Sequence, residues 1–211
     1  MQAESSQIVG IVGGSCAGKS WLAERLQQAL PAKAARLSQD DFYRDRSHLS
    51  SGRRARLNFD HPRAIDWARL EQVLLQVTRG KAAAVPRYDF VTHGRLPDEI
   101  ALGPAPIVIV EGLWLFRRAA VRNLFLLKVF IRSSNELCIE RRLHRDTLER
   151  GRTREQVLEQ LHRYTLPMFE RFVSPQEKWA DVVLQAPVRA AAVDQLAATL
   201  QKKNFNSLVG I

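Results

Sequence analysis

Near its start the chain reads Ile8-Val9-Gly10-Ile11-Val12-Gly13-Gly14-Ser15-Cys16-Ala17-Gly18-Lys19-Ser20. The apolar run ends at two glycines, and leucine and alanine then recur at helical spacing as far as Pro31. This order predicts a strand, a glycine turn and a helix.

Residues 13–20 fit the pattern G-x-x-x-x-G-K-[ST] of a phosphate-binding loop, or P-loop. In such a loop the backbone N–H groups wrap phosphates, the lysine reaches the terminal phosphates and the hydroxyl binds Mg²⁺. The alternative is a glycine-rich turn without a ligand, and the flanking strand and helix argue against it. We assign the following residues to the phosphates of ATP or GTP: Gly13, Gly14, Ser15, Cys16, Ala17, Gly18, Lys19, Ser20 and Trp21.

Apolar runs and helical patterns alternate along the rest of the chain. We expect strands at 34–37, 107–110, 124–131 and 181–184, and helices at 67–77, from about 132 to about 150, and at 193–200. A further helical pattern at 151–172 contains Pro167, which predicts a kink near the preceding turn. The alternation predicts an α/β fold, namely a doubly wound parallel sheet of the P-loop NTPase kind, covered by helices on both faces.

Length and composition favour one domain over residues 1–211. Hydrophobic residues make up 45% and charged residues 26%, as in ordinary globular proteins. No apolar run approaches the about 18 residues of a membrane span, and the first residues lack a signal-peptide pattern. We therefore expect a cytoplasmic protein with no membrane partner. Two cysteines are too few for a disulfide framework or a zinc site.

The net charge of +10 favours anionic partners, which could be nucleic acid or the phosphates of a nucleotide. Arginines gather at 141–154, in a segment that also carries acidic residues. This mixture suits a phosphate-binding lid better than an arm that binds nucleic acid. We therefore expect no nucleic-acid partner.

Two carboxylates follow predicted strands. Glu111 ends the strand 107–110 and could hold Mg²⁺ beside the P-loop, or it could cap the next segment. Asp40 follows the strand 34–37, where ligands of open α/β sheets bind, and could take the proton of an attacking hydroxyl. Asp41 is the alternative base, and an Asx turn is the alternative role for this segment.

Several segments together carry a family resemblance. They are the P-loop, Gln39-Asp40-Asp41-Phe42-Tyr43, Asn58-Phe59-Asp60-His61-Pro62, Pro86-Arg87-Tyr88-Asp89-Phe90, Glu111-Gly112, and Arg145-Asp146 with Glu149-Arg150-Gly151-Arg152. In order and spacing, from about residue 7 to 185, the chain resembles the uridine (uridine–cytidine) kinases of the phosphoribulokinase/uridine kinase family. The Asn58–Pro62 and Pro86–Phe90 segments are specific to the nucleoside kinases of that family.

The resemblance implies a role for each matching residue. Asp40 matches the catalytic base near the 5′-hydroxyl, and Ser20, Glu111 and Asp40 match the magnesium site. Asp60 matches the carboxylate on the ribose hydroxyls, Phe59 and Phe90 flank the base, and Tyr88 with His93 reads the pyrimidine edge. Arg142, Arg152 and Gln160 match contacts to the nucleoside, while Lys19, Arg145 and Arg150 match groups near the transferring phosphate.

Structural roles are the alternative for these residues. A lone histidine is more often a surface or core residue, and Tyr88 with Phe90 could form one face of a short strand. The arginines could belong to a helix with surface ion pairs to Glu140, Asp146 and Glu149.

The implied activity is Mg²⁺-dependent transfer of the γ-phosphate of ATP or GTP to the 5′-hydroxyl of uridine or cytidine. A lid at about 142–160, a nucleoside-binding insert at about 58–100 and a homo-oligomer, possibly a tetramer, go with the resemblance. Residues 185–189 depart from the family's usual turn near the nucleotide base, so the preference for ATP or GTP stays open. The rivals are a kinase of the same family for another hydroxyl (a phosphorylated sugar, pantothenate or nicotinamide riboside) and a nucleotide-dependent protein that binds nucleic acid.

Overall fold

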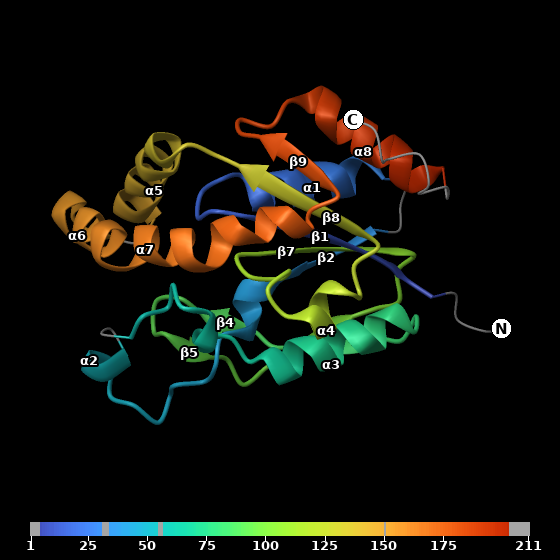
Figure 1. Ribbon diagram of the computed structural model, residues 1–211. Helices are drawn as coiled ribbons and strands as arrows, with labels where there is room; N and C mark the ends of the chain where they lie inside the picture. The colour runs from blue at the N-terminus through green and yellow to red at the C-terminus, as the bar shows by residue number, and fades with distance from the viewer. Residues whose placement is uncertain (1–4, 31–33, 55–56, 150, 203–211) are drawn as a thin grey trace.

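A computed structural model describes residues 5–30, 34–54, 57–149 and 151–202 (Figure 1). Its centre is a sheet of five parallel strands in the order β2-β7-β1-β8-β9. The strands are β1 (Gln7–Gly13), β2 (Ala34–Ser38), β7 (Ile107–Gly112), β8 (Leu127–Arg132) and β9 (Val182–Gln185). The predicted parallel sheet is confirmed.

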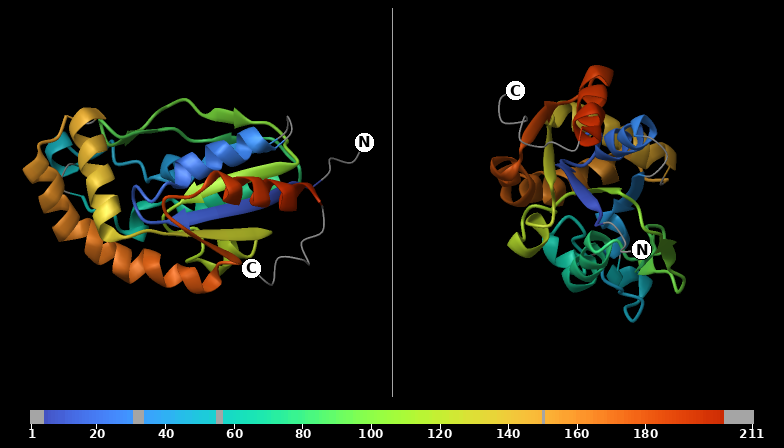
Figure 2. Two further views of the ribbon diagram at one scale, coloured as in Figure 1. Left: turned by 90° about the horizontal axis from the view of Figure 1, so that it is seen from above. Right: turned by 90° about the vertical axis from the view of Figure 1, so that its right-hand side faces the viewer.

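Helices cover both faces of this sheet, because its strands are apolar on both sides. Along β1, Ile8 and Val12 pack into one core and Val9 and Ile11 into the other. Helices α1 (Lys19–Ala29) and α8 (Ala190–Gln201) lie together on one face, and α3 (Trp67–Thr78) and α4 (Ala119–Arg122) lie on the other (Figures 1 and 2). The doubly wound arrangement is therefore confirmed.

The weakly periodic segment between β2 and β7 is built from short elements. It contains a 3₁₀ turn (Gln39–Phe42), α2 (Ser51–Arg54), a second 3₁₀ turn (Pro62–Ala64) and α3. Two antiparallel ribbons follow: β3 (Ala83–Val85) pairs with β6 (Ile100–Leu102), and β4 (Tyr88–Asp89) pairs with β5 (Gly94–Arg95). Strands this short show no alternation over enough residues to be recognised in the sequence.

A long helical path follows β8 and extends past the carboxyl ends of the strands (Figure 2). It comprises α5 (Asn135–Glu149), α6 (Arg154–Gln160), a π-helical turn (Leu161–Thr165), α7 (Leu166–Met168), a second π-helical turn (Phe169–Val173) and a 3₁₀ segment (Ser174–Trp179). The π-helical turns lie on either side of Pro167, whose missing N–H removes one regular helical bond. Where the sequence predicts a kink, the structure has these wider turns.

One predicted boundary is wrong. The strand expected from residue 124 begins at Leu127, because the N–H groups of Leu124 and Phe125 bond to the carbonyls of Val121 and Arg122 in the turn that ends α4. Within the described residues, no helix is long and apolar enough to cross a membrane.

Candidate active site

The P-loop joins the end of β1 to the start of α1. Gly18 has φ = 103° and Cys16 has φ = 63°, so two residues of the turn adopt left-handed backbone conformations. A Cβ at Gly13 would lie 2.8 Å from the carbonyl oxygen of Ile131 on β8, a contact that only glycine avoids. The Nζ of Lys19 donates to the carbonyl of Gly14 at 2.8 Å, so the ammonium group lies over the loop.

The candidate magnesium ligands meet beside this loop. Ser20 Oγ lies 3.3 Å from Glu111 Oε1, and Ser38 Oγ donates to the same oxygen at 2.9 Å. The strand pairing explains the second contact, because Ser38 lies opposite Glu111 in the β2–β7 register. Ser38 Oγ also accepts the N–H of Asp40 at 3.2 Å. One hydroxyl therefore links the two acids that the sequence singles out.

Negative charge accumulates at this edge of the sheet. Burial, and then the nearby charge of Glu111, raises the pKa of Asp41 to about 6. Oxygen donors are the ligands that Mg²⁺ prefers, and in kinases the protein supplies only one or two of them beside phosphates and water. No cluster of three or more His, Cys, Asp or Glu side chains suited to a metal occurs among the residues that the structure describes. A hydroxyl and a carboxylate beside a phosphate loop fit Mg²⁺ held mainly by a nucleotide.

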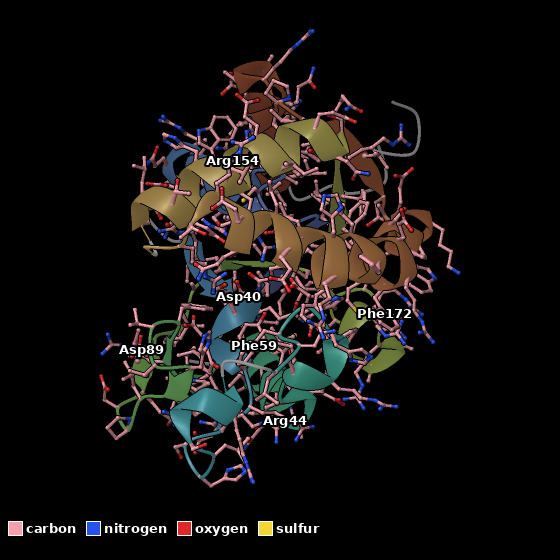
Figure 3. All side chains as sticks on the ribbon, turned by 90° about the vertical axis from the view of Figure 1, so that its left-hand side faces the viewer. Asp40, Arg44, Phe59, Asp89, Arg154 and Phe172 are labelled. Atoms are coloured by element: carbon pink, nitrogen blue, oxygen red, sulfur yellow. The ribbon has the colours of Figure 1, made fainter. Side chains whose placement is uncertain are left out.

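A cavity of about 620 Å³, including its open mouth, lies next to the P-loop. Figure 3 shows Asp40 and Phe59 between helices α5 and α6 and the β4–β5 ribbon that carries Asp89. The cavity is lined by Ser15, Asp40, Tyr43, Phe59, Asp60, Tyr88, Phe90, His93, Leu113, Arg142, Arg145, Arg152 and Gln160. All predicted nucleoside contacts therefore surround one space, together with Asp40 and Arg145.

Aromatic rings form one end of this cavity. Phe59 and His93 stack with ring centroids 4.6 Å apart and an interplanar angle of 13°. Tyr88 lies on β4, so the short strand proposed as its alternative role is present, and it still lines the cavity. Burial raises the pKa of Tyr88 to about 12, and its hydroxyl has no hydrogen-bond partner in the described part of the chain. A buried hydroxyl in a cavity is suited to a polar group of a ligand.

Tyr43 is a cavity residue that the sequence analysis did not assign. Its ring contacts those of Phe59, Tyr88 and Phe90, with centroids 5.8, 5.1 and 6.2 Å away. Its hydroxyl donates to the carbonyl of Phe59 at 3.1 Å, which fixes the turn that carries Asp60. Tyr43 stands in the quoted Gln39–Tyr43 segment, but nothing in the sequence shows that it reaches residues 59, 88 and 90.

Asp146 brings the arginines of the cavity together. Its side chain is fully buried, and its oxygens lie 3.5 Å from Arg142 Nε, 2.8 Å from Arg145 Nη2 and 3.5 Å from Arg152 Nη1. The alternative reading in the sequence analysis made Asp146 part of a surface ion-pair pattern, and its burial excludes that alternative. The carboxylate instead holds three guanidinium groups at the cavity.

Arg142 also contacts a second carboxylate, that of Asp60. Arg142 Nη1 is 3.8 Å from Asp60 Oδ1, and Thr165 Oγ1 donates to Asp60 Oδ2 at 3.0 Å. Arg152 also donates to the side-chain oxygen of Gln160. Thr165 was not predicted, and its place in the first π-helical turn gave no signal in the sequence.

The remaining predicted residues lie elsewhere. Trp21, predicted as a nucleotide contact, is 41% exposed on α1, with the guanidinium carbon of Arg25 5.8 Å from its ring centroid, and its contact with the nucleotide stays a prediction. Arg150 lies outside the described residues. Arg141, which was not predicted, donates to the carbonyl of Cys16 at 3.3 Å and so connects α5 to the P-loop.

A P-loop at the carboxyl edge of a doubly wound parallel sheet, with paired acids and an arginine-lined cavity beside it, defines a P-loop phosphotransferase. The chain belongs to the Phosphoribulokinase / Uridine kinase family, whose model matches residues 8–192. Membership implies a nucleotide as the phosphate donor.

Individual relatives agree with this family. A uridine kinase of Tolumonas auensis is 37% identical over 182 residues, which cover 84% of this chain and 85% of that protein. A uridine kinase of Aeromonas salmonicida is 35% identical over 202 residues, covering 93% and 94%. Among solved structures, phosphoribulokinase from Rhodobacter spheroides superposes with a TM-score of 0.66 at 20% identity, covering 86% of this chain and 70% of that one. The last comparison shows a shared fold.

Proposed function

We propose that the chain transfers the γ-phosphate of ATP or GTP to the 5′-hydroxyl of uridine or cytidine. The observation that carries this proposal is the single cavity that joins the P-loop residue Ser15 and Asp40 to Asp60, Tyr88 and His93. Two relatives named uridine kinases are 37% and 35% identical to the chain over the aligned residues, which cover most of its length. A volume of about 620 Å³ falls within the usual range of small-molecule sites.

Asp40 is the proposed base. It lines the cavity, whereas Asp41 is absent from the cavity lining and lies close enough to Glu111 for its pKa to be raised. The 5′-hydroxyl oxygen forms a bond to the γ-phosphorus, the bond to the bridging oxygen breaks, and the hydroxyl proton passes to Asp40. Lys19 and Arg145 stabilise the charge that develops on the phosphoryl oxygens.

Ser20 and Glu111 are the proposed magnesium ligands, and Asp40 takes part through water. Bound Mg²⁺ supplies charge neutralisation at the phosphates. Burial is the main cause of the raised pKa of Asp41 and the charge of Glu111 is the second, and a divalent cation beside Glu111 would offset that charge.

Polar side chains bind the ribose and the polar edge of the base, and aromatic rings pack against the base. Asp60 accepts hydrogen bonds from the ribose hydroxyls, and its pairing with Arg142 and Thr165 keeps the carboxylate oriented. Phe59 and Phe90 offer apolar surface to the base, and the Tyr88 hydroxyl and the His93 ring face its polar edge. Arg152, which precedes α6, and Gln160 at the end of α6 complete the nucleoside contacts.

We retain the domain plan as a proposal: one domain over 1–211, with a nucleoside-binding insert at about 58–100 and a lid at about 142–160. Arginines of the lid segment and aromatic residues of the insert lie around the same cavity, which supports closure of one onto the other over the substrate. Arg150 remains a proposed phosphate contact. The homo-oligomer stays a prediction that sedimentation measurements test.

The test is a matrix of uridine, cytidine and purine nucleosides against ATP and GTP, with Mg²⁺ and the purified chain. We expect UMP and CMP to form. The Lys19→Ala variant, prepared identically, should form almost none, which excludes a contaminating kinase. A folded chain that makes neither product, or that phosphorylates a sugar phosphate, pantothenate or nicotinamide riboside faster, overturns the proposal.

A further inference from the structure

A second cavity lies on the other side of the Phe59–Asp60 segment from the candidate active site. It is lined by Arg44, Arg46, His61, Pro62, Arg63, Trp67, Arg117, Arg118, Arg171 and Phe172, and shares none of these with the first cavity. Its space is about 1100 Å³, including the open mouth. Figure 3 shows Arg44 and Phe172 on opposite sides of this region, both away from Asp40.

Six of the ten lining residues are arginines, and none is acidic. In the part of the chain that the structure describes, no ion pair within 4.0 Å joins any of these six guanidinium groups to a carboxylate. Asp45, which stands between two of them in the sequence, instead accepts the N–H and the hydroxyl of Ser47, at 2.9 and 2.8 Å. Positive charge therefore converges on this cavity, and no described carboxylate pairs with these guanidinium groups.

Aromatic rings position half of these arginines. The guanidinium carbon of Arg117 lies 4.5 Å from the ring centroid of Phe172, and that of Arg171 lies 5.2 Å from it. Arg118 lies 5.5 Å from the ring of Trp67. A guanidinium group over an aromatic face keeps its N–H edges free to donate, so these groups are arranged in advance for an acceptor with several oxygens.

His61 is a residue of the Asn58–Pro62 segment to which the proposed activity assigns no role. Its Nδ1 accepts the N–H of Arg63 at 3.0 Å, and its ring packs edge-on against Phe172 at 4.8 Å. Burial, and then the charges of three arginines of the cavity, lower the pKa of His61 below its usual value. The ring therefore senses the positive charge of this cavity directly.

We propose that this cavity binds a small anion with several phosphate groups, recognised through the phosphates alone. Six convergent arginines repel one another, and a multiply charged anion removes that repulsion while accepting paired hydrogen bonds. Trp67 and Phe172 are buried, at 8% and 7% exposure, and arginines lie over both rings, so neither ring offers an open face on which a base could stack. A concave cluster also fits a compact anion better than an extended nucleic acid, which binds along a stripe of charge.

The two cavities share structural elements. Asp60 lines the first cavity and the next residue, His61, lines the second. Phe172 of the second cavity belongs to the π-helical turn that begins at Phe169. The ring of Phe169 lies 3.2 Å from a Cβ built at Gly14 of the P-loop. An anion bound at the arginines therefore lies beside His61, which is next to Asp60, and beside the helical turn that packs against the P-loop. Binding itself depends on neither the proposed activity nor its substrate.

The test measures tripolyphosphate binding by calorimetry in EDTA, in a Lys19→Ala background that weakens the P-loop. Adding Arg117→Gln and Arg171→Gln should weaken binding at least about tenfold, the loss expected for two charge-assisted contacts. Adding Arg36→Gln and Arg79→Gln, two exposed arginines elsewhere, removes the same charge and should change binding less than about twofold. Equal losses in both variants, or no binding in the parent, overturn the proposal.

Two further measurements separate the possible ligands and avoid reliance on a variant that fails to fold. ATP and UTP should bind the Lys19→Ala chain about as tightly as tripolyphosphate. If the nucleotides or a single-stranded oligonucleotide bind more than about tenfold more tightly, the ligand is not recognised through its phosphates alone and the proposal is overturned. In the unmutated chain, NMR titration should show the pKa of His61 rising when tripolyphosphate is added, since the anion offsets the arginine charges. An unchanged His61 titration contradicts binding at this cavity.

Discussion

Replacing Asp146 with asparagine tests the most heavily buried charge of the candidate active site. The carboxylate is fully buried and contacts three arginines, so the neutral side chain leaves positive charge uncompensated. One asparagine oxygen can still accept from Arg145, whose Nε and Nη2 both bond to Oδ1 at 2.8 Å. The amide nitrogen then faces Arg142 and Arg152, which contact the other carboxylate oxygen.

The magnitude follows from the exposure of the three partners. Breaking a buried ion pair costs about 3–5 kcal/mol. The side chains of Arg145 and Arg152 are 29% and 26% exposed and can regain water, whereas that of Arg142 is 6% exposed and cannot. We therefore expect the lower end, about 3 kcal/mol. In a chain of this length this corresponds to a fall in Tm of about 6–12 °C.

Calorimetric unfolding and steady-state kinetics measure the two consequences. Because Arg142 also contacts Asp60, we expect kcat/KM for the nucleoside to fall about 10²-fold, the usual effect of misplaced binding groups. Asp98→Asn is the matched control, since the Arg87–Asp98 pair is exposed on both sides and should leave the Tm and kinetics unchanged. If Asp146→Asn unfolds at the temperature of the control, the carboxylate does not hold these arginines.

Three other changes test separate parts of the site. Asp40→Asn should keep nucleotide affinity within about twofold but lower kcat by about 10²–10⁴-fold, and full turnover would refute its assignment as base. Gly13→Ala places a methyl group 2.8 Å from the Ile131 carbonyl and should destabilise the chain by about 1–3 kcal/mol in urea unfolding, whereas an unchanged midpoint would show that β1 and β8 separate easily. In EDTA, stability should fall as pH rises from about 4 to about 6, because the pKa of Asp41 is raised from 3.8 to about 6 and the unfolded chain gives up this proton first. Asp41 is only half-buried, so solvent screening reduces its contribution to stability. Above pH 6, Asp41→Asn should therefore be more stable than the parent by on the order of 1–2 kcal/mol, with no gain at pH 4. An equal gain in stability at both pH values would contradict this.

The fold could be predicted because its signals are local. Both faces of the central strands β1 and β7 are buried, so these two strands stand in the sequence as continuous apolar runs, and the helices repeat their apolar residues at helical spacing. The P-loop needs only a turn of eight consecutive residues, whose ligands are largely backbone N–H groups. The ribbon β3–β6 escaped prediction and a short strand at Tyr88 stood only as an alternative, since two or three residues carry no usable period.

By itself, the sequence determined the phosphate loop, the alternating α/β order and the candidate residues whose spacing resembles a known family. Only the tertiary structure decided which of these share a space. The β2–β7 register brings Ser38 opposite Glu111, and Asp60 meets Thr165 across 105 positions of the chain. Asp146, a surface acid only in the alternative reading, is the buried partner of three described arginines, and His61 lines a second, arginine-lined cavity apart from that of Asp60. Burial and long-range contacts arise from packing between distant elements, and no local pattern of residues encodes them.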